Sequence, residues 1–278
     1  MAWDEVAADV FVKRYEAGDV NVVAILGPKG VTVIDTRGSP AEAREIVGDV
    51  AKRFGTPIVG AVNTHAHYDH SFGNSVFVDL GVPVIGHHRI PDHYAAFEGP
   101  RLRAWQADPA REPDKQWDHV VLTQPTVLIQ RSTTLTASGR NIELIPISRG
   151  HTDTDLIVYV PDAGVWALGD AIEESGPPMF GSGCWPIEWP AALDEVLLRM
   201  QPNDVVVPGH GRLVDREFVT RQAIALHAVE DAIKSAHAAG AGIEEALDTV
   251  QLPWPKWMLR SAFEQGFSQL DQRLPSGH

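Results

Sequence analysis

Short hydrophobic runs recur along the chain in two blocks, and their alternation with polar positions predicts β-strands. In the first block, turn-like segments such as EAGD and GPKG separate the runs, which is typical of an antiparallel meander. The second block begins after residue 125. The predicted strands are 9–15, 20–26, 31–36, TPIVGAVNTH and 83–87 in the first block, and 126–130, 132–137, 141–148, 156–160, 164–170 and 204–211 in the second.

Helical spacing accompanies both blocks. Ser39 as N-cap, Pro40 at the first helical position and Glu42 at the third predict a helix over residues 40–54. Residues 100–120, with their charges, tryptophans and prolines, show no clear periodicity, so we expect an irregular insertion there. The remaining predicted helices cover 71–81, 90–99, 189–200 and most of the chain from residue 215 onward.

Two strand-rich halves that each carry helices predict an α/β protein in which a sandwich of sheets is covered by helices on both outer faces. The chain has 278 residues, of which 44% are hydrophobic, enough for one large domain or for one domain with an extension. We expect a main domain over residues 1–215 and a helical C-terminal extension over 216–278, packed on that domain.

The charge balance narrows the choice of partners. The chain carries 23 basic and 37 acidic residues and a formal net charge of −14, which repels a phosphate backbone. We therefore expect a small-molecule substrate and no nucleic acid. The N-terminal residues lack the pattern of a secretory signal, and no apolar run is long enough to span a bilayer, so we expect a cytoplasmic protein with no membrane partner. The single cysteine, Cys184, cannot form an internal disulfide.

Three histidines and an aspartate stand within the six residues HAHYDH at 65–70, directly after an apolar run. Residues two apart in a strand project from the same face, so His65 and His67 can point together at one ion. Asp69 and His70 follow in a turn that can bend back over the same spot. Imidazoles and carboxylates without thiols suit zinc or a similar first-row ion. For these six residues alone, a solvated polar loop is the alternative.

Three more polar residues follow apolar runs elsewhere in the chain. His151 comes just after NIELIPIS, Asp170 ends GVWALGD, and His210 stands in the Gly-His-Gly that closes VVVPGHG. Strand ends form a shared rim, so four strand ends with ligand-type residues predict one metal site rather than four unrelated loops.

These motifs together resemble the metallo-β-lactamase superfamily of hydrolases. The resemblance rests on HAHYDH at 65–70, GHTDTD at 150–155, ALGD at 167–170 and PGHG at 208–211. It implies an αββα sandwich with a centre of two divalent ions, most simply zinc, with manganese or iron as alternatives. The implied ligands are His65, His67 and His151 for the first ion, Asp69, His70 and His210 for the second, and Asp170 as the bridge.

The resemblance also implies a reaction. Two neighbouring ions can share a hydroxide that attacks an ester, lactone, thioester or amide carbonyl. Asp69 is the implied catalytic residue, which orients the hydroxide and handles a proton. Aspartate at position 170 is similar to the glyoxalase II and lactonase branch, because β-lactamases of the superfamily are expected to have cysteine or serine there. The loop after Asp170 lacks the Gly-Cys-Gly-Arg type of segment expected in glyoxalase II.

Alternatives remain at this point. The same framework can hold one iron on His65, His151 and Asp170 and act as a persulfide dioxygenase; weak β-lactamase or phosphodiesterase activity is also chemically reasonable. Phe180, Trp185 and Trp189 are candidates for the wall of a substrate pocket, with packing of helix 190–200 onto the sheet as the alternative. The other histidines are expected to have no metal role: His87, His88, His93, His119, His227, His237 and His278.

Overall fold

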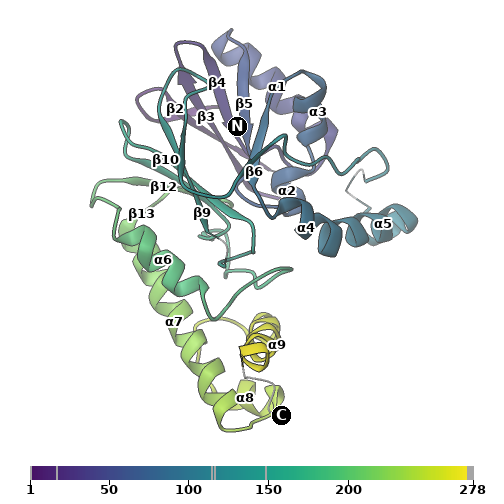
Figure 1. The fold of residues 1–278 in the computed structure, drawn as a ribbon, viewed down its shortest axis with the longest axis vertical. Helices are drawn as coiled ribbons and strands as arrows, with labels where there is room; N and C mark the ends of the chain where they lie inside the picture. Colours follow the sequence, from purple (N-terminus) through teal and green to yellow (C-terminus); the bar gives the residue numbers. More distant parts are fainter. Residues whose placement is uncertain (1, 17, 114, 116, 148, 274–278) are drawn as a thin grey trace.

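The computed structural model describes residues 2–16, 18–113, 115, 117–147 and 149–273, and it contains two β-sheets packed face to face (Figure 1). The predicted strand position Ser148 and the predicted extension beyond residue 273, with His278, lie outside the described residues. The first sheet contains, in spatial order, β1 (Asp4–Ala7), β2 (Val10–Tyr15), β3 (Val20–Gly27), β4 (Gly30–Ile34), β5 (Ile58–Val62), β6 (Val84–His87) and β7 (Val127–Ile129). The second contains β13 (Val214–Asp215), β12 (Val205–Pro208), β11 (Val165–Gly169), β10 (Asp155–Val160), β9 (Ile142–Ile147) and β8 (Thr133–Leu135).

The predicted meander is confirmed, because β1 to β4 pair antiparallel with their neighbours in the chain. From β4 to β7 the first sheet is parallel. The assignment of residues 126–130 to the second block was wrong, since β7 pairs with β6 through Ile85–Val127 and His87–Ile129. Three paired residues are too few to predict which of the two sheets a strand joins. The chain crosses from the first sheet to the second only after residue 129, and the sequence does not mark that point.

Alternation along the strands explains why both faces of the first sheet are buried. Val10 and Val12 of β2 belong to the core between the two sheets, whereas Phe11 between them points to the outer face. The inner core is completed from the second sheet by residues such as Leu144 and Leu156. On the outer face, Phe11 packs with helical residues such as Ile46, so helices cover the sheet as the sequence predicts.

Helix α1 (Pro40–Phe54) begins as predicted, with the Ser39 Oγ accepting a hydrogen bond from the backbone N–H of Glu42 at 3.3 Å. It lies with α3 on the outer side of the first sheet (Figure 1). The other helices are α2 (Tyr68–Ser71), α3 (Asn74–Asp79), α4 (Ile90–His93), the π-helix η1 (Tyr94–Glu98), α5 (Gly99–Ala107), the 3₁₀-helix η2 (Pro109–Arg111), α6 (Trp189–Leu197), α7 (Arg216–Ala238), α8 (Ile243–Thr249) and α9 (Lys256–Arg273).

The expectation of an irregular segment over residues 100–120 was wrong at its start, which is the helix α5. Its sequence shows no amphipathic period because only Leu102 and the half-buried Trp105 contribute apolar contacts. Trp105 stacks on Trp117 with ring centroids 4.3 Å apart, and both rings contact Tyr68 edge-on. Tertiary aromatic contacts therefore stabilise this helix, and such contacts leave no repeat in the sequence.

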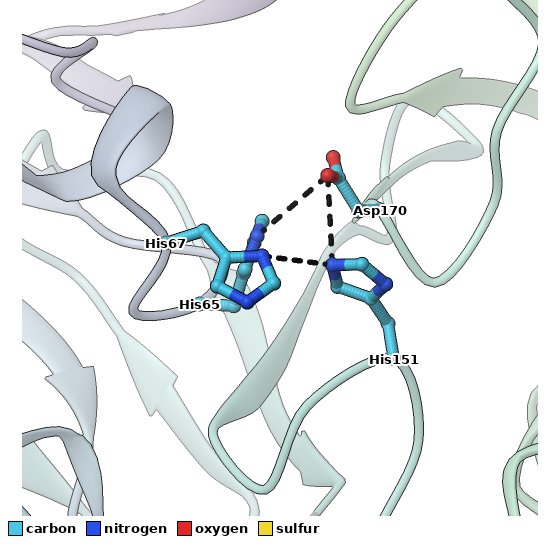
Figure 2. Close-up of side chains that lie close together, drawn as sticks. All are labelled: His65, His67, His151 and Asp170. Atoms are coloured by element: carbon cyan, nitrogen blue, oxygen red, sulfur yellow. Dashed lines mark hydrogen bonds and ion pairs between the residues drawn. The ribbon is translucent and has the colours of Figure 1, made fainter. Parts of the chain in front are cut away.

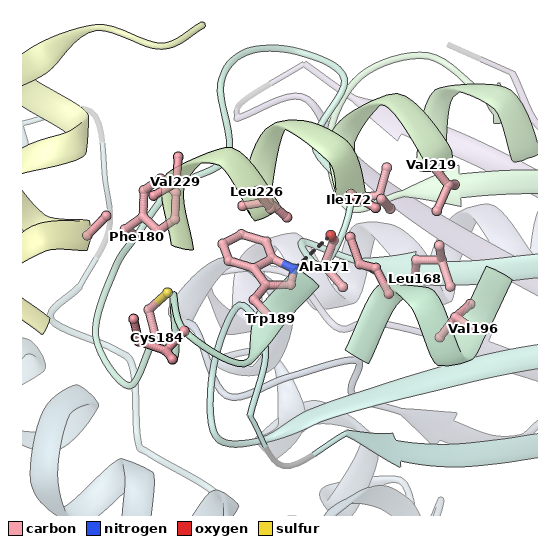
Figure 3. Packing of buried hydrophobic residues seen from close by; sticks show 14 of the residues in the cluster. Leu168, Ala171, Ile172, Phe180, Cys184, Trp189, Val196, Val219, Leu226 and Val229 are labelled. Carbon is pink, nitrogen blue, oxygen red and sulfur yellow. Dashed lines mark hydrogen bonds between the residues drawn. The ribbon is translucent and has the colours of Figure 1, made fainter. Parts of the chain in front are cut away.

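Helices α6 and α7 cover the outer face of the second sheet, and α9 packs against α7 (Figure 1). Asp215 caps α7 by accepting the N–H of Phe218 at 2.9 Å. Trp189 of α6 lies fully buried beside Leu226 and Val229 of α7 and donates its ring N–H to the Ala171 carbonyl at 3.2 Å (Figure 3). Among the described helices, none combines the length and the apolar character that a membrane span requires.

Candidate metal centre

The predicted ligand residues meet at one rim of the sandwich. His65 and His67 follow the end of β5, Asp69 and His70 lie in α2, and the others stand in the loops after β9, β11 and β12. The two sheets are joined at this rim by the buried side chain of Asn21, which donates to the carbonyls of Pro208 at 3.0 Å and Gly211 at 2.9 Å. Strand ends that are distant in sequence are thereby held next to one another.

Three histidines and one carboxylate form the first donor cluster (Figure 2). The Nε2 of His151 lies 3.0 Å from the Nδ1 of His67. The Oδ2 of Asp170 lies 3.7 Å from the Nε2 of His65 and 3.6 Å from the Nε2 of His151. One potential ligand atom from each of the four residues falls within 4.8 Å of the others. All four side chains are buried.

The second donor cluster contains Asp69, His70 and His210. The Nε2 atoms of His70 and His210 lie 3.2 Å apart, and the Oδ2 of Asp69 is 3.4 Å from the Nε2 of His210. The other oxygen of Asp170, Oδ1, faces this cluster at 3.1 Å from His70 and 3.5 Å from His210. The structure thus brings together all seven residues that the sequence singled out, and the two oxygens of Asp170 face different clusters.

The donor set fits divalent metal. Ring nitrogens that face each other at 3.0 and 3.2 Å lie at separations usual for ligands of one ion. The Nε2 of His65 is buried and has no hydrogen-bond partner among the described residues. Buried polar atoms normally have a partner, so this orphaned nitrogen indicates a group that occupies the space between the rings. Imidazole and carboxylate ligands without thiols suit zinc, manganese or iron.

The outer ring nitrogens of four of the ligands are held by the protein. Such contacts fix the tautomer and orientation of a ligating imidazole. The contacts are His65 Nδ1 to Thr64 Oγ1 at 3.1 Å, His67 Nε2 to the Ser182 carbonyl at 3.2 Å, His70 Nδ1 to Asp35 Oδ2 at 2.8 Å, and His210 Nδ1 to the Gly18 carbonyl at 2.6 Å.

The two clusters differ in their protonation. Burial, followed by the charge of the neighbouring His67, lowers the pKa of His151 to about 3. In the second cluster burial also favours the neutral ring, but the Asp170 carboxylate, followed by Asp69, raises the pKa of His210 to about 12. The pKa of His70 is raised for the same reason, against the effect of burial. Burial therefore favours neutral imidazoles in the first cluster, whereas the carboxylates of Asp69 and Asp170 favour the charged form of the rings in the second.

Comparison with known proteins identifies the family. The model of the family described as "Metallo-beta-lactamase superfamily" matches residues 15–210, which include both donor clusters. The chain belongs to the metallo-beta-lactamase superfamily. It is a hydrolase of that superfamily with a His/Asp site that can hold metal, which agrees with the resemblance carried by the four motifs.

Curated relatives in the metallo-beta-lactamase superfamily are distant and have different names. The type 2 metallo-beta-lactamase of Bacillus cereus is 23% identical over 203 residues, which are 72% of this chain and 70% of that protein. A linear primary-alkylsulfatase of Pseudomonas sp. is 26% identical over 82% of this chain, but the match spans only 49% of the sulfatase. The human acyl-coenzyme A thioesterase MBLAC2 is 27% identical over 57% of this chain and 60% of the thioesterase.

Solved structures confirm the metallo-beta-lactamase fold. A metallo-beta-lactamase from Pontibacter korlensis superposes with a TM-score of 0.64 at 18% identity, covering 81% of this chain and 98% of that protein. The sec-alkylsulfatase Pisa1 from Pseudomonas sp. superposes with a TM-score of 0.76 at 19% identity, covering 100% of this chain and 50% of that protein. At these identities the likeness concerns the fold alone.

Two residues of this superfamily site were missed from the sequence. Asp35 accepts hydrogen bonds from the Thr64 N–H at 2.7 Å and from the His70 ring at 2.8 Å, and its backbone has a left-handed φ of 69°. The sequence did mark Asp35 as a candidate, because it directly follows the apolar run VTVI. Glu173 is buried beside Asp170 and His210, where burial, then the charge of Asp170, raises its pKa to about 7. No periodicity or motif pointed to Glu173.

The three candidate pocket residues do not share one environment in this metallo-beta-lactamase fold. Phe180 and Trp189 lie in the buried core between α6, α7 and the second sheet, which favours the packing alternative for both. Trp185 is half-buried and lines a cavity of about 780 Å³ together with His93, Ser182 and residues of α9. Cys184 is a buried free thiol, as expected for a small residue in this loop.

Proposed function

We propose that the protein is a dinuclear metallohydrolase that cleaves an ester, lactone, thioester or amide bond. The observation that carries the proposal is the position of Asp170, whose two oxygens face two separate donor clusters at 3.1 to 3.7 Å. A carboxylate so placed suits a bridge between two ions. The oxidative alternative needs only one ion, on His65, His151 and Asp170, and leaves the second cluster without a role.

Two divalent ions, with zinc the expected metal and manganese or iron as alternatives, would lower the pKa of a water molecule between them and polarise the scissile carbonyl. His65, His67 and His151 would hold the first ion. Asp69, His70 and His210 would hold the second, and Asp170 would hold both. The outer hydrogen bonds of the rings keep these donors aimed inward.

Asp69 is the proposed proton carrier. Its carboxylate is partly exposed, 18% for the side chain, while Asp170 beside it is 10% exposed, so Asp69 is accessible to a substrate at the rim. Burial opposes its ionisation, but His70 and His210 lower its pKa to about 2. An ionised Oδ atom can accept a hydrogen bond from the attacking water and later transfer that proton to the leaving group.

The substrate class follows from position 170 and from the family. Aspartate there, in place of cysteine or serine, favours a glyoxalase II or lactonase-like substrate over a β-lactam. The names of the relatives add acyl-coenzyme A thioesters and alkyl sulfates to the substrates to be tested. The net charge of −14 disfavours nucleic-acid phosphodiesters.

Elemental analysis and a substrate screen test the proposal together. Protein loaded with zinc or manganese is assayed against lactones, thioesters, aryl esters, alkyl sulfates, phosphodiesters and a chromogenic β-lactam. We expect close to two ions per chain and hydrolysis of a carbonyl substrate. Protein with at most one ion, found to be iron, and with persulfide oxidation as its activity would overturn the hydrolase proposal. The matched control is the Asp170→Ala protein, which should be inactive in every hydrolytic assay.

A further inference from the structure

A buried polar network lies behind His67, on the side away from the first donor cluster. The Nδ1 of His67 faces His151, so its Nε2 points outward and donates to the Ser182 carbonyl at 3.2 Å. The Oγ of Ser182 lies 3.3 Å from the same Nε2. Ser182 is therefore the residue that sets the angle of the His67 ring.

Ser182 is held in turn by residues of the segment that runs from η1 into α5. Its hydroxyl donates to the Oε1 of Glu98 at 3.4 Å and accepts from the Nη2 of Arg101 at 3.0 Å. Glu98 is fully buried at the end of the π-helix η1, and Arg101 lies 3.0 Å from its Oε1. π-helical turns are rare and are frequently found at functional sites. A buried carboxylate is costly unless it is paired, and here it is paired.

The network is not a third metal site. The ring nitrogens of His67 and His93 and an oxygen of Glu98 lie within 4.8 Å of one another, which by distance alone could hold an ion. However, the guanidinium of Arg101 lies 3.0 Å from that carboxylate and repels a cation there. His93 is anchored by the Oδ1 of Asp153 at 2.6 Å, and its Nε2 lies 3.9 Å from the Oε1 of Glu98. The cluster is a set of ion pairs and hydrogen bonds around one ligand ring.

We propose that Glu98 is a positioning residue for the first metal site: it fixes Ser182, and Ser182 orients the imidazole of His67. This inference rests on the metal centre of the proposed function. It concerns only the first donor cluster, because among the described residues the second cluster has no hydrogen bond or ion pair to Glu98 or Ser182. Contacts of this type behind a ligating histidine typically contribute about 10- to 100-fold in metal affinity.

The loop that carries Ser182 has a second support that does not involve Glu98. The side-chain amide of Gln265 in α9 donates to the carbonyls of Phe180 and Gly181, both at 3.0 Å. Ser261 of the same helix also donates to the Phe180 carbonyl, at 2.5 Å. Loss of the Glu98 charge should therefore loosen the Ser182 side chain without releasing the loop.

The experiment isolates the first cluster by using His210→Ala protein, in which the second cluster has lost a ligand. The zinc affinity of this protein is measured by competition with a chelating dye. Glu98→Gln, Ser182→Ala and the double variant are then introduced into it. We expect each single change to weaken zinc binding about 10-fold, the lower end of the usual range, because the Ser182 carbonyl still accepts from the His67 Nε2. The double variant should lose no more zinc affinity than the single variant with the larger loss, because Glu98 acts on His67 through Ser182.

Glu264→Gln is the matched control, since Glu264 is an exposed carboxylate that lines the same cavity as Ser182. It should leave zinc affinity unchanged. The absorption spectrum of the cobalt-loaded proteins gives a second measure of ligand geometry, and it should change in the Glu98 and Ser182 variants only. Thermal unfolding of each metal-free protein checks that it is folded.

Several results would overturn the inference. A folded Glu98→Gln protein with zinc affinity within about twofold of its parent contradicts it, as do strictly additive effects in the double variant. If Glu98→Gln does not fold, a Ser182→Ala protein with unchanged zinc affinity contradicts the inference instead. Wild-type protein that binds two ions, combined with any of these results, leaves the proposed function intact. Wild-type protein that binds no ion overturns both.

Discussion

One carboxylate, that of Asp170, connects the two donor clusters at the rim. Its charge is stabilised in a buried position because His70 and His210 lower its pKa against the effect of burial. Replacement by alanine removes a donor from both clusters and leaves those rings without their counter-charge. We expect Asp170→Ala to lose both ions together in elemental analysis after dialysis. The control is Asp162→Ala, an exposed aspartate paired with Arg140, which should keep full occupancy.

The proton-transfer role proposed for Asp69 can be tested separately from metal occupancy. Asp69→Asn preserves the size of the side chain and one oxygen, so two ions should still bind under saturating metal. The amide cannot accept the proton, and positioned proton transfer is typically worth about 10² to 10⁴ in rate. For the best substrate we expect kcat to fall at least about a hundredfold. An Asp69→Asn protein with two ions and more than roughly a tenth of the wild-type kcat would exclude Asp69 from proton transfer.

Metal binding should release protons from the second cluster but not from the first. The pKa of His210 is raised to about 12, so its ring is protonated at pH 7 and must lose that proton to bind an ion. The pKa of His151 is lowered to about 3, so this ring is already neutral. Calorimetric titration of metal-free protein with zinc in buffers of different ionisation enthalpy measures the difference.

The zinc affinity of the second cluster should depend on pH. Protons compete with the ion at the second cluster, so its zinc affinity should rise with pH between 6 and 8 more steeply than that of the first. His210→Ala protein should release fewer protons per ion than wild type. Equal proton release in the two proteins would contradict the protonation assigned to His210.

The sequence singled out the seven candidate ligand residues, which the structure brings together, because each stands in a short motif after an apolar run. Asp35 carried the same signal and could have been found. Glu98, Ser182 and Glu173 could not, since nothing local distinguishes a buried carboxylate or hydroxyl from an exposed one. Their roles depend on side chains that are close in space and distant in sequence.

At the scale of elements, the loop after β12 is built around a glycine that lies against the carboxylate of Asp170. A Cβ on Gly209 would lie 1.8 Å from the Oδ1 of Asp170 and 3.0 Å from its backbone nitrogen. Gly209→Ala must therefore displace Asp170, and we expect it to reduce metal occupancy in a protein that still folds. Gly48→Ala is the control, because its Cβ would meet nothing within 4 Å in helix α1. That change should keep full occupancy and slightly raise stability, by roughly 0.5–1 kcal/mol.

A helix or strand could be predicted where its own residues supply a cap, a proline or a hydrophobic pattern. Helix α1 has its cap, its proline and its amphipathic face, and it was predicted residue for residue. Helix α5 has Pro100 in its first turn but neither a side-chain cap nor an amphipathic face, and aromatic contacts from Tyr68 and Trp117 stabilise it. Strand β7 was recognised as a strand but assigned to the wrong sheet, since three paired residues do not encode their neighbour.

At the scale of the whole molecule, the C-terminal helices share one core with the second sheet. Trp166 and Leu168 of β11 belong to the same buried cluster as Leu226 of α7 and Phe263 of α9. Neither the sheet face nor the helices can bury these side chains alone. We therefore expect the extension and the sandwich to unfold together.

Substitution in α7 tests this coupling. Leu226 is fully buried in the shared core, so Leu226→Ala should destabilise the protein by about 2–5 kcal/mol, the usual cost of such a cavity. Ile224 in the same helix is 64% exposed, and Ile224→Ala should change the free energy of unfolding by less than about 0.5 kcal/mol. In urea, far-UV circular dichroism reports mainly the helices, and fluorescence reports the eight tryptophans, of which Trp166 and Trp189 lie in the shared core. Because one core holds both parts, the two signals should share one midpoint in wild type and shift together in Leu226→Ala. Two separate midpoints for the two signals would mean that the helices unfold as a separate unit.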